Sequence, residues 1–148
     1  MSDAIQMFVP GEPTPEGSTK AYIVGGKPVI SHVNSAKLET WRDTITLLTT
    51  TLARKAGWKI PLDEPVKIYV KFLLQPPARP RFSTPAVKPD LDKLQRAVGD
   101  GLCPKGGGGV LKDDSRIIEW HAWKQYAERH GQTGALIRIE KMKVKADV

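Results

Sequence analysis

The stretch from Val66 to Leu74 alternates between apolar and polar side chains, and this pattern constrains the fold more than any other part of the sequence. Successive side chains of a β-strand point to opposite faces, so the pattern predicts a strand with one apolar face. The residues of that face are Val66, Ile68, Val70, Phe72 and Leu74. Such a face has to be buried under a second layer of structure, so the chain needs elements that cover it.

Two segments have the apolar spacing of helices that can cover the strand. The first helix is predicted from about Ala36 to Ala56, with Asn34 or Ser35 as its cap and Gly57 as its stop signal. Its stripe repeats at spacings of three and four and consists of Leu38, Trp41, Ile45, Leu48 and Leu52. The second helix is shorter, and its stripe consists of Leu91, Leu94, Val98 and Leu102.

Shorter strands complete the pattern. Ile5 to Val9 form an apolar run that ends at Pro10, and Lys20 to Ile30 can form a hairpin that turns at Gly25-Gly26. Two further strands are predicted from Arg116 to Gln125 and from Ala135 to Lys141. The order strand, hairpin, helix, strand, helix, strand, strand predicts an α/β fold. We expect a small mixed β-sheet packed against two main helices, in a single domain of residues 1–148.

The chain has 148 residues, a net charge of +7 and a pI of about 9.6, which favours a polyanionic partner. Its single cysteine, Cys103, excludes an internal disulfide and favours a reducing, cytoplasmic setting. No apolar run approaches the ~18 residues that a membrane helix needs, so no membrane partner is expected. Met1 to Pro10 lack the basic start and the long apolar stretch of a signal peptide.

Acidic residues gather in two short motifs of this basic chain. Asp90 and Asp92 stand at the start of the second helix, and Asp113-Asp114 follow a run of glycines. Magnesium prefers hard oxygen ligands and needs few carboxylates when substrate phosphates complete its shell. The pairs therefore predict one magnesium site, provided that the strand after Asp114 pairs beside Val66–Leu74. Aspartates at a helix start are also common as plain caps, and Asp-Asp pairs are common in solvated turns.

Basic residues surround these acids. Arg79, Arg81 and Lys88 lie in a proline-rich loop, Gln75 to Pro89, that leads into the first acidic motif and contains no acid. Lys93, Arg96 and Lys112 stand next to the acids themselves. Positive charge around carboxylates indicates a site for a metal ion together with a phosphate-bearing substrate. Lys20 belongs to a polar loop that can touch phosphate.

The sequence contains three motifs in this order: Lys88-Pro89-Asp90-Leu91-Asp92-x-Leu94-x-Arg96, Asp100-Gly101-Leu102, and Leu111-x-Asp113-Asp114-Ser115-x-Ile117. Together they resemble the RusA-type Holliday junction resolvases, which are common in phages and prophages. The similarity extends over most of the chain and includes Lys124, in the strand after the second acidic pair.

The resemblance implies a small α/β homodimer that cleaves four-way DNA junctions with magnesium. It implies that Asp90, Asp92 and Asp114 are catalytic. A lysine of the family is replaced here by Arg96, and Lys93 stands where the family usually has asparagine. Residues three apart on a helix are neighbours, so we expect Lys93 and Arg96 to supply positive charge together near the scissile phosphate.

These observations lead to one leading hypothesis, a magnesium-dependent endodeoxyribonuclease that resolves Holliday junctions, with Mn²⁺ able to substitute. The expected metal ligands are Asp90, Asp92, Asp113 and Asp114. The expected DNA contacts are Lys20, Arg79, Arg81, Lys88, Lys112 and Lys124. Three alternatives stay open at this point: a catalytically impaired protein that still binds branched DNA, a nuclease that prefers forks or flaps, and a sugar-nucleotide transferase.

Overall fold

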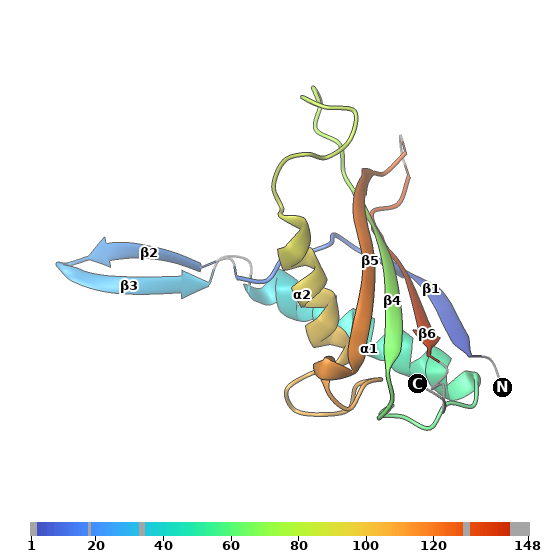
Figure 1. Cartoon of the computed structure of the whole chain (residues 1–148). Coiled ribbons are helices and arrows are strands. Elements are labelled where there is room, and N and C mark those ends of the chain that lie inside the picture. Colours follow the sequence, from blue (N-terminus) through green and yellow to red (C-terminus); the bar gives the residue numbers. More distant parts are fainter. Residues whose placement is uncertain (1–2, 18, 33–34, 129–130, 143–148) are drawn as a thin grey trace.

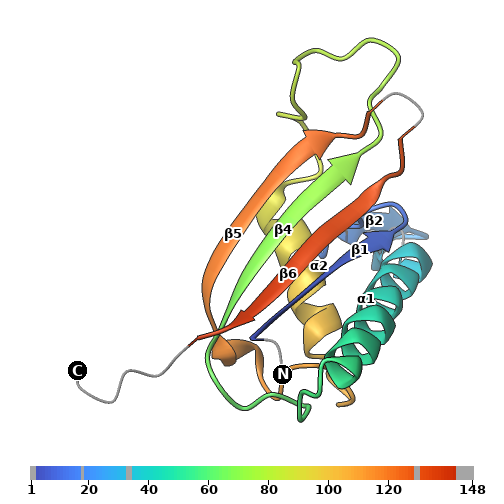
Figure 2. The same cartoon turned by 90° about the vertical axis from the view of Figure 1, so that its right-hand side faces the viewer.

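The fold is a four-stranded sheet with two helices on one of its faces, seen in a computed structural model that describes residues 3–17, 19–32, 35–128 and 131–142 (Figures 1 and 2). The strand order is β1-β6-β4-β5, with bounds Ala4–Pro10 for β1, Gly134–Lys141 for β6, Val66–Leu74 for β4 and Ile117–Tyr126 for β5. Strands β4 and β5 run parallel, and the other two pairs are antiparallel. The predicted α/β fold with a mixed sheet is confirmed.

The helices and the hairpin also follow the prediction closely. Helix α1 spans Ser35–Lys55 and helix α2 spans Leu91–Leu102. Strands β2 (Thr19–Val24) and β3 (Lys27–His32) form a separate hairpin that projects from the body of the molecule in Figure 1. One difference lies before β5. Arg116, the predicted first residue of this strand, belongs to a single 3₁₀ turn, η1 (Asp114–Arg116), and β5 begins one residue later.

The core lies between the helices and the sheet, with β4 at its centre. All five apolar residues predicted on one face of β4 are buried, and Phe72 is the largest of them with no exposed surface. Helix α1 departs from its predicted stripe, because Thr49 and Ala53 are fully buried while Leu48 and Leu52 are only partly buried. The hydroxyl of Thr49 donates to the carbonyl of Ile45 at 2.6 Å, which satisfies the buried polar group within the helix.

The two helices approach each other closely at Gly101 of α2. A Cβ atom at this position would lie 2.8 Å from Cγ2 of Ile45 and 3.2 Å from the carbonyl oxygen of Arg42. The hydroxyl of Thr46 also donates to the carbonyl of Gly101 at 2.6 Å, across the interface between the helices. A glycine is therefore required here for packing, and this contact fixes where α2 lies over the sheet.

The connection from α2 to η1 contains the four consecutive glycines of the sequence. Gly106, Gly107 and Gly108 face open space, since nothing would contact a Cβ atom added to any of them. Gly109 differs, because a Cβ atom there would clash with the carbonyl of Leu102 and the ring of Pro104. The loop is thus open at its tip and tightly packed where it returns to the domain.

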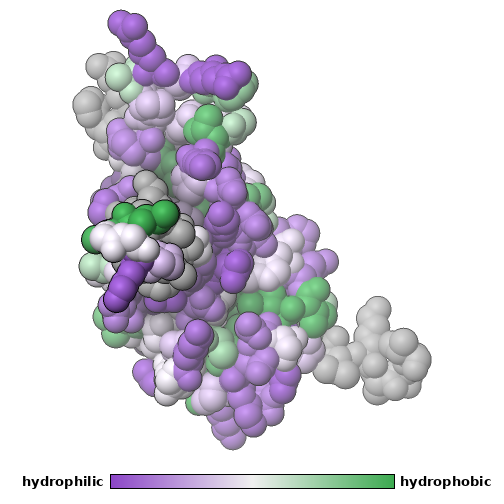
Figure 3. Space-filling model, turned by 90° about the vertical axis from the view of Figure 1, so that its left-hand side faces the viewer, coloured by the Kyte–Doolittle hydropathy of each residue, from purple (hydrophilic) through white to green (hydrophobic). Residues whose placement is uncertain are grey.

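The surface from which the hairpin projects is mostly hydrophilic, with small hydrophobic patches (Figure 3). At the hairpin turn, Ile23 and Val24 are 77% and 56% exposed. Among the described residues, no helix combines the length and the apolar character that crossing a bilayer requires.

Candidate active-site groove

A groove of about 450 Å³ runs between helix α2 and strand β5. Its walls bring together both acidic motifs predicted from the sequence: Asp92, Gln95, Arg96, Gly99, Asp100, Asp114, Ile117 and Trp120. The groove exists because α2 connects the parallel strands β4 and β5 and packs along β5, so the first turn of α2 and the turn that enters β5 border its two ends. The predicted pairing of β5 beside β4 is confirmed.

Helix α2 contributes one face to this groove. Asp92, Arg96 and Asp100 are spaced four residues apart, so they follow one another along the same side of the helix. The opposite side carries the core residues Leu94 and Val98, which are fully buried. Arg96 therefore lies between two carboxylates in the groove.

Lys93 lies elsewhere and contacts the first aspartate of the motif. Its Nζ is 3.9 Å from the carboxylate of Asp90, and both side chains are about half exposed. Unlike Arg96, Lys93 is not part of the groove wall. Of the two cations that the sequence predicts near the phosphate, Arg96 lines the groove, and Lys93 contacts Asp90, which does not line the groove either.

Asp114 enters the groove from η1, which contacts α2 near its C-cap. Its neighbour there is Cys103, the C-cap of α2. Burial raises the pKa of the Cys103 thiol, and the negative charges of Asp114 and Asp113 raise it further. Cys103 is therefore a neutral thiol at neutral pH, which is typical of a packing residue rather than a nucleophile.

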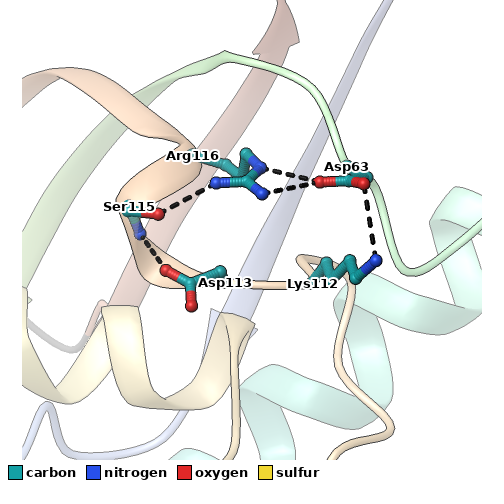
Figure 4. Close-up of polar contacts among 5 residues, drawn as sticks. All are labelled: Asp63, Lys112, Asp113, Ser115 and Arg116. Atoms are coloured by element: carbon teal, nitrogen blue, oxygen red, sulfur yellow. Dashed lines mark hydrogen bonds and ion pairs between the residues drawn. The ribbon is translucent and has the colours of Figure 1, made fainter.

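Asp113 was expected as a metal ligand beside Asp114, but its side chain caps η1. Its carboxylate accepts a hydrogen bond of 2.8 Å from the backbone N–H of Ser115 (Figure 4). This bond holds the pKa of Asp113 below its usual value. Of the acidic pair, Asp114 is thus the residue that faces the groove, while Asp113 shapes the turn that presents it.

A second set of contacts anchors the same turn from outside. The guanidinium of Arg116 binds the carboxylate of Asp63 through both Nε and Nη2 at 2.8 Å, and Lys112 reaches the same carboxylate at 3.5 Å (Figure 4). The hydrogen bond from Arg116, followed by the charge of Lys112, lowers the pKa of Asp63. Asp63 comes from the connection between α1 and β4, so this network ties that connection to the turn that carries Asp114.

Asp90 occupies the N-cap position of α2, as predicted, but does not cap the helix with its side chain. An N-cap aspartate usually accepts a hydrogen bond from the first turn of its helix. Here the carboxylate makes no such bond, and the side chain is about half exposed. It is consequently available to a ligand.

The donor chemistry of these residues suits magnesium, although their arrangement in one chain does not form a compact cluster. Within the described part of the chain, no three His, Cys, Asp or Glu residues are close enough together to hold a metal ion. Asp92 and Asp100 are eight residues apart on α2, which corresponds to about 12 Å along the helix axis. Because magnesium can be bound by one or two carboxylates with phosphates and waters completing the shell, Asp90 with Asp92 is a sufficient protein contribution.

A comparison with protein families finds a match to the endodeoxyribonuclease RusA family over residues 10–140. The chain belongs to the RusA family. The match includes the groove and both acidic motifs, and it implies endonuclease activity on Holliday junctions. A comparison with curated proteins found no match.

The DNA contacts expected for a RusA-family chain fall into three groups. Arg79, Arg81 and Lys88 are exposed in the proline-rich loop, which extends beyond the sheet at the N-terminal end of α2 (Figure 1). Lys112 and Lys124 are engaged within the chain, Lys112 with Asp63 and Lys124 with two backbone carbonyls. Lys20 falls in β2, where its side chain lies outside the described part of the structure.

Sequence reasoning missed several groove residues of this RusA-family domain. Asp100 and Trp120 line the groove, and Arg42 reaches Asp100 at 3.8 Å while binding Glu16 at 2.8 Å. Asp100 had a readable signal, because it follows Asp92 and Arg96 at helical spacing. Glu16 and Arg42 had none, since their meeting depends on how the N-terminal loop and α1 pack against α2.

Proposed function

We propose that this chain is a magnesium-dependent endonuclease that resolves four-way DNA junctions by hydrolysing phosphodiester bonds. The observation that carries the proposal is the shared groove, in which Asp92 and Asp114 come from the two acidic motifs and Arg96 lies beside Asp92. Family membership supports the substrate class. Carboxylates for a metal and a cation for phosphate are the groups that this reaction requires.

One or two magnesium ions would be held, by Asp90 and Asp92 at the N-terminal end of α2 and by Asp114 at the other end of the groove. Bound magnesium would activate a water molecule and stabilise the oxygen that leaves the phosphorus. The chain itself contributes rigidity, because Asp113 and the Asp63–Arg116 pair hold the turn that carries Asp114. Mn²⁺ would satisfy the same oxygen ligands.

Arg96 would offset the negative charge that builds up on the phosphate during hydrolysis. Its position in the groove favours it over Lys93, which contacts Asp90 outside the groove wall. Arg96→Ala should therefore lower single-turnover cleavage more strongly than Lys93→Ala. If both variants cleave at nearly the wild-type rate, neither Arg96 nor Lys93 stabilises the charge on the phosphate.

DNA binding would depend on the exposed basic loop. Arg79, Arg81 and Lys88 would contact backbone phosphates without reading sequence, as a structure-selective enzyme requires. A two-fold dimer would present two grooves to a junction that itself has two-fold symmetry. The enzyme would act in the cytoplasm, which is that of the infected host cell if the gene is phage-borne.

The decisive experiment measures nicking of a synthetic four-way junction with and without Mg²⁺. Asp92→Asn should lower cleavage at least about a hundredfold, since loss of even an outer-shell partner of a metal site costs ten- to a hundredfold. Junction binding should stay intact or tighten, because a charge that repels phosphate is removed. Glu39→Gln, an exposed acid on α1 outside the groove, is the matched control and should cleave normally.

Two alternatives give different results in the same assay. A catalytically impaired junction-binding protein would bind the wild-type substrate and cleave nothing with either Mg²⁺ or Mn²⁺. A nuclease for other branched DNA would cut forks or flaps faster than junctions. Full activity of Asp92→Asn would refute the assignment of the groove.

A further inference from the structure

Lys124 has a position that differs from that of a DNA-contacting lysine. It lies on β5 opposite Phe72 of β4, on the sheet face that the helices cover, and its side chain is only partly exposed. Its Nζ donates hydrogen bonds to the carbonyl of Val87 at 2.8 Å and to the carbonyl of Pro89 at 2.9 Å. The ammonium group is therefore directed into the protein, at the point where the proline-rich loop enters α2.

Both of these bonds are made by a charged donor, which strengthens them relative to bonds between neutral groups. An ammonium group has three donors in total, so two of the three are already used inside the chain. A phosphate contact by Lys124 would have to be made with the remaining donor or after breaking these bonds. The two carbonyls flank Lys88, and this residue points its own charge outward as an exposed side chain.

The same few residues explain how α2 begins without a side-chain cap from Asp90. The carboxylate of Asp90 makes no capping bond to α2, so the usual means of fixing the start of a helix is not used here. Lys124 fixes the backbone immediately before Asp90 instead, through the carbonyl of Pro89. The start of α2 is thus held by a neighbouring strand, and the aspartate keeps its oxygens for another partner.

We propose that Lys124 is a positioning residue for the acidic motif, which it holds in place so that Asp90 can bind metal rather than cap the helix. This inference rests on the proposed metal-dependent nuclease function. It places Lys124 in the nuclease without contact to DNA or to the reacting atoms. It also makes β5 the common support of the groove, because Asp114 precedes this strand and Lys124 holds Asp90 near its other end.

The test compares Lys124→Met with two lysine variants, Lys88→Met in the loop and Lys59→Met in the connection after α1. For Lys124→Met we expect single-turnover cleavage of the junction to fall at least tenfold, and the Mn²⁺ concentration for half-maximal cleavage to rise severalfold. Junction affinity without metal should change less than threefold, with the same dependence on salt. Trypsin should cut the loop after Arg81 severalfold faster, because the loop has lost its anchor, whereas Arg79 and Lys88 are protected by the prolines that follow them.

The control variants define the alternative. Lys88→Met should weaken junction binding and lower the salt slope by about one, the signature of a lost phosphate contact. Lys59→Met, an exposed lysine, should match the wild type in every measurement. If Lys124→Met behaves like Lys88→Met, with normal trypsin resistance and normal Mn²⁺ dependence, Lys124 is a DNA contact and the positioning role is wrong.

A second variant guards against a simple loss of folding. Lys124→Arg keeps the charge and can still donate to carbonyls, so it should recover at least part of the cleavage and of the trypsin resistance. Recovery of neither in a protein that melts like the wild type would overturn the proposal. Failure of the proposed nuclease function is recognised separately, because the wild-type protein would then cleave no junction. The trypsin comparison would still show whether Lys124 anchors the proline-rich loop.

Discussion

The close contact between α1 and α2 at Gly101 allows a sharp test of the packing beside the groove. In Gly101→Ala the new Cβ would lie 2.8 and 2.9 Å from two carbons of Ile45, well inside ordinary contact distance. Forcing one extra carbon into a packed interface costs about 1–3 kcal/mol. Alanine in place of glycine within a helix returns up to about 1 kcal/mol, and less near a helix end.

The net expectation for Gly101→Ala is a loss of about 1–2 kcal/mol in the free energy of unfolding. For a domain of this size that loss lowers Tm by about 3–8 °C. Gly99→Ala is the matched control, because it lies on the same helix and its Cβ would meet only Trp120, at 3.9 Å. Gly99→Ala should be as stable as the wild type or up to about 1 kcal/mol more stable.

Denaturant unfolding followed by tryptophan fluorescence measures both variants under one condition. If Gly101→Ala proves as stable as Gly99→Ala, the helices do not meet as closely as described, and the position of α2 over the sheet needs another explanation. Because α2 carries Asp92 and Arg96, Gly101→Ala should also slow cleavage by more than its folded fraction accounts for.

Two further predictions concern the turn that presents Asp114. Asp113→Asn keeps a side-chain oxygen that can accept from the N–H of Ser115, so this variant should cleave junctions nearly as well as the wild type. Asp113→Ala loses that hydrogen bond and should cleave clearly less. An equal loss of cleavage in both variants would indicate a direct role for the carboxylate. The Asp63–Arg116 pair should stabilise the fold in a pH-dependent way, because the pKa of Asp63 is lowered from its ordinary value of 3.8. That stabilisation is present above about pH 5 and disappears as the pH falls through the lowered pKa, so Tm of Asp63→Asn should trail the wild type at neutral pH and approach it near pH 3. A Tm difference that is constant with pH would contradict this role for Asp63.

The layered fold was predictable because its main signals are local. The alternation of β4 and the apolar spacing of α2 depend only on neighbouring residues, and both were confirmed, with Leu91 of the α2 stripe partly rather than fully buried. Helix α1 begins at Ser35, within one residue of its predicted start, and the predicted cap Asn34 lies outside the described residues. The burial of Thr49 in place of Leu48 was not predictable, because it depends on the angle at which α1 crosses α2 rather than on its own sequence.

The candidate site was predictable in part. Asp92, Asp114 and Arg96 were identified from motifs, and the structure brings all three into one groove. The division of labour within each motif was not predictable, since Asp113 caps a turn and Lys93 lies outside the groove wall. These differences arise because neighbouring residues of a turn or a helix point their side chains in different directions. Sequence spacing alone does not show which of two neighbours faces the groove.

The open tip of the glycine loop is a suitable position for attaching a label to this enzyme. Residues 106–108 face empty space and lie between the helix and the strand that form the groove, whereas Gly109 anchors the returning chain. Lengthening a loop at an exposed tip costs little free energy, about 0.6 kcal/mol for each doubling of its length. A short peptide inserted between Gly107 and Gly108 could therefore carry a fluorescent dye close to the groove, and report DNA arrival without touching any residue that binds or cleaves it.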